Sequence, residues 1–166
     1  FLGLGRLYEE FPIHPHRVHI LNGGDKFAMG DRTVTAIRPP LYDSSATCGI
    51  WDPKSEIYYA ADCFGIVAED VPNFTDEISE KDYEEQFFFM NRANHIWFEH
   101  VKSEAIAEAA EKIKKLDAKY LVSGHGPTAR KNVDRLCDMI KRIGDMPPIE
   151  LPDHDTYEML VKEAGL

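Results

Sequence analysis

The stretch that decides the fold is "YDSSATCGIWDPKSEIYYAADCFG", residues 42–65. Two short apolar runs, at about 48–51 and 57–61, flank an Asp-Pro-Lys turn signal, so the stretch predicts two strands joined as a β-hairpin. Carboxylates stand at both ends, with Asp43 before the first strand and Asp62 after the second. Such positions, at strand ends on loops held by a rigid sheet, are where α/β folds place catalytic and metal-binding groups.

Further strands are predicted on both sides of this hairpin. Upstream, "RVHILNGGDKFAMGDRTVTAIRPP" alternates apolar and polar residues, which predicts short strands near 17–21, 26–29 and 33–38. Downstream, "AKYLVSGHG" is a short apolar run stopped by glycines, so it predicts a strand whose exit loop contains His125. Residues 1–16 show no clean periodicity and are predicted to be an irregular lead-in.

Helices dominate the rest of the chain. Ser103 is a predicted N-cap for a helix with apolar residues at spacings of three and four, and 128–143 repeats that spacing. A last short helix is predicted near 154–164, where Asp153 can cap its start. The order is β-rich first and α/β second, without internal repeats, which indicates one layered α/β or α+β domain over residues 1–166.

The composition argues against two classes of binding partner, nucleic acids and membranes. The chain has 29 acidic and 19 basic residues and a formal net charge of −10, which opposes binding to nucleic acid or to anionic membrane surfaces. No run approaches the ~20 consecutive apolar residues of a membrane span, and the start lacks a signal-peptide pattern. A cytoplasmic protein is therefore predicted. Cys48, Cys63 and Cys137 form no CxxC pair, so free, mostly buried thiols are expected.

Three polar residues at strand ends form a candidate metal site. Asp43, Asp62 and His125 offer two carboxylates and an imidazole, a partial ligand set that suits zinc, iron or manganese. The alternative for each aspartate is a turn former or helix cap that satisfies backbone N–H groups. Glycines on both sides of His125 allow the close backbone approach that a merely exposed histidine does not require.

The joint pattern carries a family resemblance. The stretch 42–65, followed downstream by "YLVSGHGP", resembles the second half of the metallo-β-lactamase superfamily over roughly residues 17–143. That family has a ligand histidine in an HTPGS-like turn, a hairpin ending in a bridging aspartate, and a last histidine in an SGHG loop. The resemblance implies the C-terminal half of an αββα fold, with Asp62 as bridging aspartate and His125 as last histidine.

This chain departs from the family pattern at the HTPGS turn. Alignment through "WDP" places Asp43 on the ligand histidine, so "DSSAT" stands where "HTPGS" would be. An aspartate ligand is harder and anionic, which favours iron or manganese, whereas an Asp-Ser turn would leave the site one ligand short. The surroundings "RPPLYDSSAT" and "NRANHIW" resemble the diiron branch, the flavodiiron and oxygen-binding diiron proteins, which implies two irons, with zinc as the alternative.

The second departure concerns the family's first metal cluster, H-x-H/E-x-D-H, which this chain does not match in full. His14, His16 and His19 have its spacing, but Val18 occupies the aspartate position and no apolar strand leads into them. They are therefore interpreted as surface or turn histidines. The resemblance then implies half of a dinuclear site. The chain is accordingly expected to be a fragment, or to use a complementing N-terminal half, or to be non-catalytic.

Three functions remain open at this point. The leading one is a metalloprotein resembling diiron oxidoreductases, in which Asp62 and His125 are the catalytic metal ligands and the substrate is a small molecule or dioxygen. The second is a zinc-dependent hydrolase of esters, thioesters or phosphoesters, and the third is a catalytically silent assembly module. A half domain exposes apolar area, so a homo-oligomer is expected. No segment resembles a flavin-binding motif.

The aromatic stretch from Tyr83 to Phe98 has two interpretations. Its phenylalanine, methionine and tryptophan side chains predict packing in the core or at an interface. Asn91, Asn94 and His95 lie among them and are candidates to line a substrate or oxygen pocket near the metal.

Overall fold

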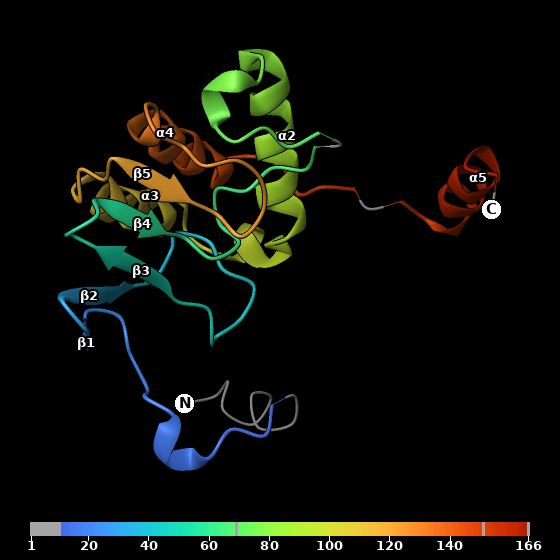
Figure 1. Ribbon diagram of the computed structural model, residues 1–166. Helices are drawn as coiled ribbons and strands as arrows, with labels where there is room; N and C mark the ends of the chain where they lie inside the picture. Colours follow the sequence, from blue (N-terminus) through green and yellow to red (C-terminus); the bar gives the residue numbers. More distant parts are fainter. Residues whose placement is uncertain (1–10, 69, 151, 166) are drawn as a thin grey trace.

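The computed structural model describes residues 11–68, 70–150 and 152–165 and shows a mixed α/β fold (Figure 1). This confirms the predicted fold class. In chain order, the elements are η1 (Pro15–Arg17), β1 (Lys26–Met29), β2 (Arg32–Ile37), β3 (Gly49–Asp52), β4 (Ile57–Tyr59), η2 (Thr75–Glu77), α2 (Glu80–Ala93), η3 (Ile96–His100), α3 (Ser103–Lys114), β5 (Tyr120–Val122), α4 (Val133–Ile143) and α5 (His154–Glu163).

The strands form one five-stranded sheet in the order β1-β2-β3-β4-β5. The first four strands are antiparallel neighbours, and β5 joins β4 in parallel. The hairpin predicted from residues 42–65 is β3 and β4, with Trp51 opposite Tyr58. Its turn is stabilised by Asp52, whose Oδ1 accepts a hydrogen bond of 3.0 Å from the Lys54 backbone N–H. Asp52 therefore acts as the turn former that its position in the sequence suggested.

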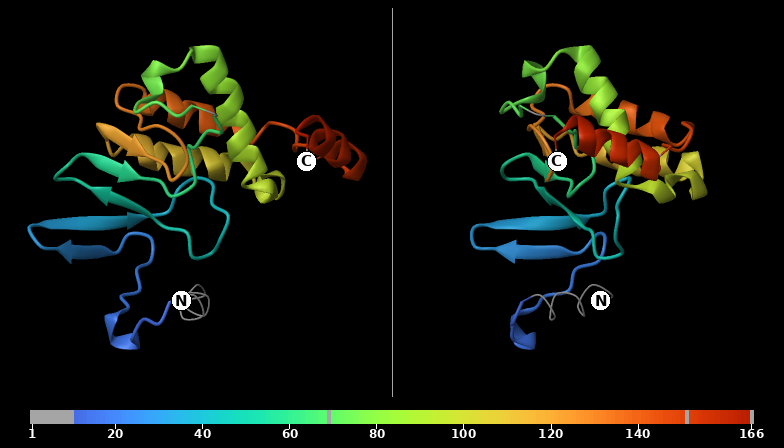
Figure 2. Two further views of the ribbon diagram at one scale, coloured as in Figure 1. Left: turned by 45° about the vertical axis from the view of Figure 1, so that its right-hand side comes forward. Right: turned by 90° about the vertical axis from the view of Figure 1, so that its right-hand side faces the viewer.

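Strand alternation gives the sheet two different faces. Tyr58 and Leu121 point to one face and are buried in the core. Trp51, opposite Tyr58 on β3, is partly buried and packs against this core. Ile50 and Tyr59 point to the opposite face and are exposed. Helices α2, α3 and α4 gather on the first face (Figure 2). These helices thus cover the face with Tyr58 and Leu121, whereas Ile50 and Tyr59 on the opposite face are partly exposed.

Two helices lie where the sequence predicted them, with corrected starts. The predicted cap at Ser103 is wrong, because Ser103 is already helical and the N-cap position is Lys102, which makes no side-chain cap hydrogen bond. Helix α4 begins at Val133 rather than at residue 128. The reason is that Ala129 exchanges two backbone hydrogen bonds of 2.9 Å with Leu121, which hold this segment extended beside β5.

The strand predicted near 17–21 is wrong. This segment contains the end of η1 and no strand, and the chain joins the sheet only from Gly24, whose N–H donates to the Ala36 carbonyl at 2.8 Å. Alternation alone does not make a strand, since a strand needs a partner for its backbone groups. Most of the predicted lead-in, residues 1–10, lies outside the described residues, and His14, His16 and His19 are exposed, as interpreted.

Helix α2 was not predicted from the sequence. Ser79 caps the helix by accepting a hydrogen bond from the Asp82 backbone N–H at 3.3 Å. Its buried side chains, Tyr83, Phe87 and Phe88 among them, confirm the packing interpretation of the aromatic stretch. Spacings of three and four were present in the sequence, but the dense charges around them obscured the pattern.

The remaining expectations concern α5, the thiols and the membrane. Helix α5 begins after Asp153, whose Oδ1 accepts from the Thr156 backbone N–H at 2.9 Å, so this predicted cap is confirmed. Cys48, Cys63 and Cys137 are free, and the last two are buried, as predicted. Within residues 11–68, 70–150 and 152–165, no helix has the length and apolar character needed to cross a membrane.

Candidate metal centre

The ends of the parallel strands β4 and β5 bring two loops side by side. The parallel ladder continues past β4, because the Ala60 N–H donates to the Val122 carbonyl at 2.8 Å. Beyond it, the Gly124 N–H donates to the Ala61 carbonyl at 2.6 Å and the Ile66 N–H donates to the His125 carbonyl at 3.2 Å. The loop after β4 and the loop after β5 are therefore joined along their length by backbone hydrogen bonds.

These loops place Asp62 against His125. The Asp62 Oδ1 and His125 Nε2 atoms are 3.0 Å apart, and the two side chains are 31% and 49% exposed. A carboxylate and an imidazole that are close together and open to solvent on one side can share a proton or bind a cation between them. Two of the three predicted site residues, far apart in the sequence, thus lie in contact.

Gly65 makes this approach possible. A Cβ at Gly65 would lie 2.9 Å from both the Cβ and the carbonyl oxygen of His125, which is too close for any side chain. Gly65→Ala is therefore expected to push the His125 loop away from Asp62 and to lower the free energy of unfolding by about 1–3 kcal/mol, the usual cost of overpacking. Chemical denaturation measures the loss, and the chemical shifts of the His125 ring report its displacement.

A matched control is Gly23→Ala, because a Cβ at Gly23 meets nothing within 4 Å and its φ lies outside the left-handed region. That variant should retain the stability of the unmodified chain. Unchanged stability and unchanged His125 ring shifts in Gly65→Ala would contradict the close approach of the two loops.

The third predicted residue, Asp43, lies on a separate exposed turn before β3. Its Oδ1 accepts a hydrogen bond of 2.7 Å from the Thr47 hydroxyl, and the Thr47 N–H donates to the Ser44 carbonyl at 3.0 Å. In this arrangement Asp43 does the work of a turn former, which was the alternative weighed for it. Its role as a metal ligand stays a prediction.

Asn91, buried on α2, holds the Asp62 loop in place. Its side-chain oxygen accepts from the Phe64 backbone N–H at 2.8 Å, and its side-chain nitrogen donates to the Gly65 carbonyl at 3.0 Å and to the Phe87 carbonyl at 2.9 Å. Phe64 has a positive φ of 66°, so the loop needs such outside support to keep its shape. Sequence reasoning considered Asn91 only for lining a pocket, because nothing local indicates a clamp.

His95 lies in the same neighbourhood and is fully buried. Its Nδ1 is 2.8 Å from the Asn91 carbonyl oxygen, an acceptor, so Nδ1 carries the proton of the hydrogen bond. Burial lowers the pKa of His95, while the Asn91 hydrogen bond and the carboxylates of Asp43 and Asp62 act in the opposite direction. His95 is therefore a neutral imidazole near the candidate centre, and its role in lining a pocket stays a prediction.

The donor chemistry fits part of a metal centre. A carboxylate oxygen and an imidazole nitrogen are ordinary ligands of iron and zinc. Protein metal sites usually take three or four protein ligands, however, and across the residues that the structure describes no group of three or more His, Cys, Asp or Glu side chains is placed to hold an ion. Asp62 and His125 thus supply one edge of a centre that needs further donors.

The fold is similar to that of flavodiiron proteins of known structure. No family model matches the sequence, and no curated protein matches it. The resemblance noted in the sequence is confirmed at the level of the fold by solved structures.

One similar structure is rubredoxin oxygen:oxidoreductase of Desulfovibrio gigas, with a TM-score of 0.67 and 16% identity over 89% of this chain and 37% of that chain. A flavo di-iron protein variant of Thermotoga maritima gives a TM-score of 0.66 and 19% identity, over 86% of this chain and 34% of that one. A diflavin flavoprotein fragment of Nostoc gives 0.66 and 21%, over 87% and 54%. The chain therefore spans between a third and just over a half of these structures.

Proposed function

We propose that this chain is the C-terminal half of a diiron-type metallo-β-lactamase-like domain and contributes Asp62 and His125 to a dinuclear iron site. The observation that carries the proposal is the 3.0 Å approach of the Asp62 Oδ1 and His125 Nε2 atoms at the ends of β4 and β5. The likeness to flavodiiron folds supports iron, and the 37% coverage of the oxidoreductase supports a domain to which more chain belongs.

Each residue of the site has a distinct role in this proposal. The Asp62 carboxylate would hold metal through oxygen, as the bridging ligand that the family resemblance implies, and His125 would hold it through a ring nitrogen. Asn91 fixes the loop that carries Asp62 and so orients the carboxylate. When bound, the metals would supply the power to activate dioxygen or to polarise a substrate. Asp43 is the third candidate ligand.

Metal affinity tests the proposal directly. The full chain is titrated with Fe(II) without oxygen and, separately, with Zn(II), and bound metal is measured by calorimetry and plasma mass spectrometry. Weak binding is expected, since fewer than four ligands are proposed in the described part of the chain. Asp62→Ala or His125→Ala should weaken it more than the ~10–100-fold that losing an outer-shell partner costs.

The matched control is His154→Ala, which removes another histidine paired with a carboxylate. His154 Nε2 lies 3.4 Å from Glu158 Oε1 on α5, with both side chains exposed. This variant should bind metal like the unmodified chain. Equal losses in His154→Ala and His125→Ala would show nonspecific binding and contradict the proposal.

A complementing N-terminal half supplies the missing donors in this proposal. Adding a polypeptide that carries the H-x-H/E-x-D-H cluster should raise the metal content and the affinity, because four or more ligands would then surround the ions. Without it, little turnover is expected. Rapid ester hydrolysis by the zinc form of the chain alone, lost in Asp62→Ala, would favour the zinc hydrolase instead. No bound metal with or without the added half would favour the silent assembly module.

A further inference from the structure

Helix α5 (His154–Glu163) is an amphipathic helix without a partner in its own chain. Its apolar side chains Tyr157, Leu160 and Val161, with Ala164 after its last turn, follow the i, i+3, i+4, i+7 spacing of a buried helix face. None of the α5 residues is buried, however, and Figure 1 shows the helix standing apart from the sheet and the other helices.

A helix of this kind needs a surface to pack on. It has 10 residues, and isolated helices shorter than about 12–15 residues are marginal in water. The Asp153 cap contributes on the order of 1 kcal/mol, which does not replace tertiary packing. The stripe of apolar residues, about 100° wide on a regular helix, indicates that the packing is made through that face.

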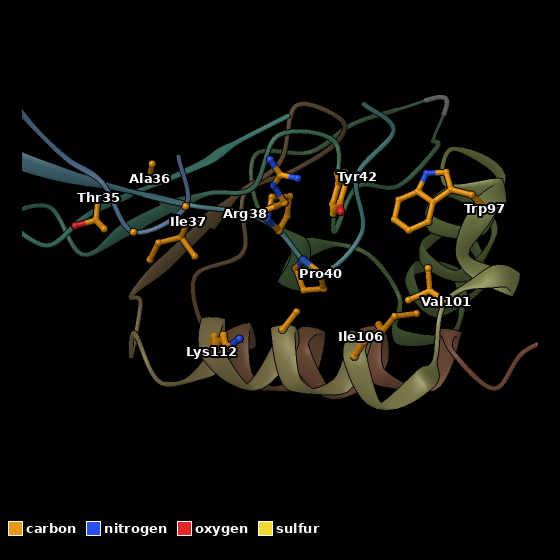
Figure 3. Close-up of a pocket in the computed structure, with 15 residues that line it drawn as sticks. Thr35, Ala36, Ile37, Arg38, Pro40, Tyr42, Trp97, Val101, Ile106 and Lys112 are labelled. Atoms are coloured by element: carbon orange, nitrogen blue, oxygen red, sulfur yellow. The ribbon is translucent and has the colours of Figure 1, made fainter. Parts of the chain in front are cut away.

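The same chain has an apolar groove between β2 and α3. Figure 3 shows it open between the sheet and the helix, and its volume is about 610 Å³. The groove is lined by apolar and aromatic side chains from both elements and from η3. They include Ile37, Tyr42, Trp97, Val101, Ala105 and Ala109. A long apolar groove beside a helix is the surface that receives amphipathic helices in peptide recognition.

Charge favours α5 as the occupant. The groove is edged by two basic side chains, Arg38 and Lys112, and Lys112 is paired with Glu108 at 3.0 Å. Arg38 stacks over Tyr42 at 4.8 Å and donates to the Ser45 carbonyl at 3.3 Å, and it has no carboxylate partner in the part of the chain that the structure describes. On α5, Glu158 and Glu163 flank the apolar stripe on its two sides. The acidic flanks of the helix thus complement the Arg38 guanidinium at the edge of the groove.

The segment between α4 and α5, called the connector below, leads α5 away from the groove of its own chain. The Arg92 guanidinium donates to the Pro147 carbonyl at 3.1 Å and so ties the connector to the end of α2. From there the chain runs outward in Figure 1 and in the left view of Figure 2, and α5 ends up clear of the body. A helix carried outward on an extended connector is placed to reach a neighbouring molecule.

We propose that α5 of one copy lies in the β2–α3 groove of a second copy, and that the exchange is reciprocal across a twofold axis. Each copy then buries one apolar helix face and fills one groove. The proposal is independent of the metal site, since neither Asp62 nor His125 takes part.

Cross-linking in trans tests the pairing. Two full-length variants are made in a Cys48→Ser background, one with Leu160→Cys and one with Ala109→Cys, and they are mixed and oxidised. Cys63 and Cys137 are buried and stay silent. A disulfide-linked heterodimer is expected on a non-reducing gel. If only a double variant cross-links, and does so within one chain, the helix fills its own groove and the proposal is wrong.

The mass of the protein in solution provides the second test. Leu160 and Met159 are 50% and 53% exposed, but Leu160 lies within the apolar stripe of α5 and Met159 lies outside it, about 100° around the helix from Leu160. Leu160→Asp should raise the dimer dissociation constant by ~10-fold or more, as loss of a central anchor does, and Met159→Asp should leave it nearly unchanged. A monomer at all concentrations, or a dimer insensitive to Leu160→Asp, would overturn the proposal. Neither substitution disturbs a buried contact within the described chain.

Discussion

Replacing Phe87 with alanine is expected to lower the free energy of unfolding by about 3–5 kcal/mol, the cost of deleting a buried aromatic side chain. Phe87 is fully buried at the centre of the core. Its ring meets Phe88 edge-on with a centroid distance of 5.8 Å and lies 5.9 Å from Tyr83 and 6.4 Å from Phe64. Denaturant unfolding monitored by circular dichroism measures the change.

The same helix offers a control for this substitution. Phe89 has the same side chain two residues further along α2, but half of it is exposed. Phe89→Ala should cost less than about 1 kcal/mol, because little apolar area leaves water at that position. Similar losses in the two variants would mean that the face of α2 that meets the core is misassigned.

The second large effect is expected for Asn91→Leu, which should lower the free energy of unfolding by about 2–4 kcal/mol. Leucine is similar in size but leaves the Phe64 N–H and the Gly65 carbonyl without their partners. A buried polar group left unpaired costs roughly 1–3 kcal/mol. The free energy of unfolding is again measured in denaturant, and amide exchange at Phe64 should become faster as the loop opens.

Asn91→Leu also links stability to the candidate site. The clamp holds the loop that carries Asp62, so metal affinity should fall even though Asn91 is no ligand in the proposed site. Asn94→Leu is the control on the same helix end, since Asn94 makes only a marginal contact of 3.5 Å with the ring of His95. Equal stability of Asn91→Leu and the unmodified chain would show that the loop keeps its shape without the clamp.

Much of the sheet could be predicted because its signals are local. The alternation in β2, the turn residues between β3 and β4, and the glycines after β5 each act within a few residues. The false strand near 17–21 shows the limit of this reasoning, because its alternation finds no neighbour to pair with. Helix α2 was missed because the dense charges around its apolar residues obscured their spacings of three and four.

In the candidate site, too, the residues marked by a local pattern were predicted and those placed by tertiary packing were not. Asp62 and His125 were found because both follow strands, and His125 also lies between two glycines, features that are visible in the sequence. The clamp by Asn91 could not be found, since its partners lie 26 and 27 residues away and are chosen by how α2 packs. For Asp43 the sequence allowed two roles, a metal ligand or a turn former. The structure shows its carboxylate in a turn, where it accepts a hydrogen bond from Thr47.

By itself the sequence determined the strands β1 to β5, the cap and apolar stripe of α5, and the identity of two donors at strand ends. Short-range turn chemistry and periodicity are enough for these features. Only the tertiary structure decided that β5 pairs in parallel with β4, which brings Asp62 within 3.0 Å of His125. Contacts between distant segments depend on the packing of the whole core, so no local pattern of residues encodes them.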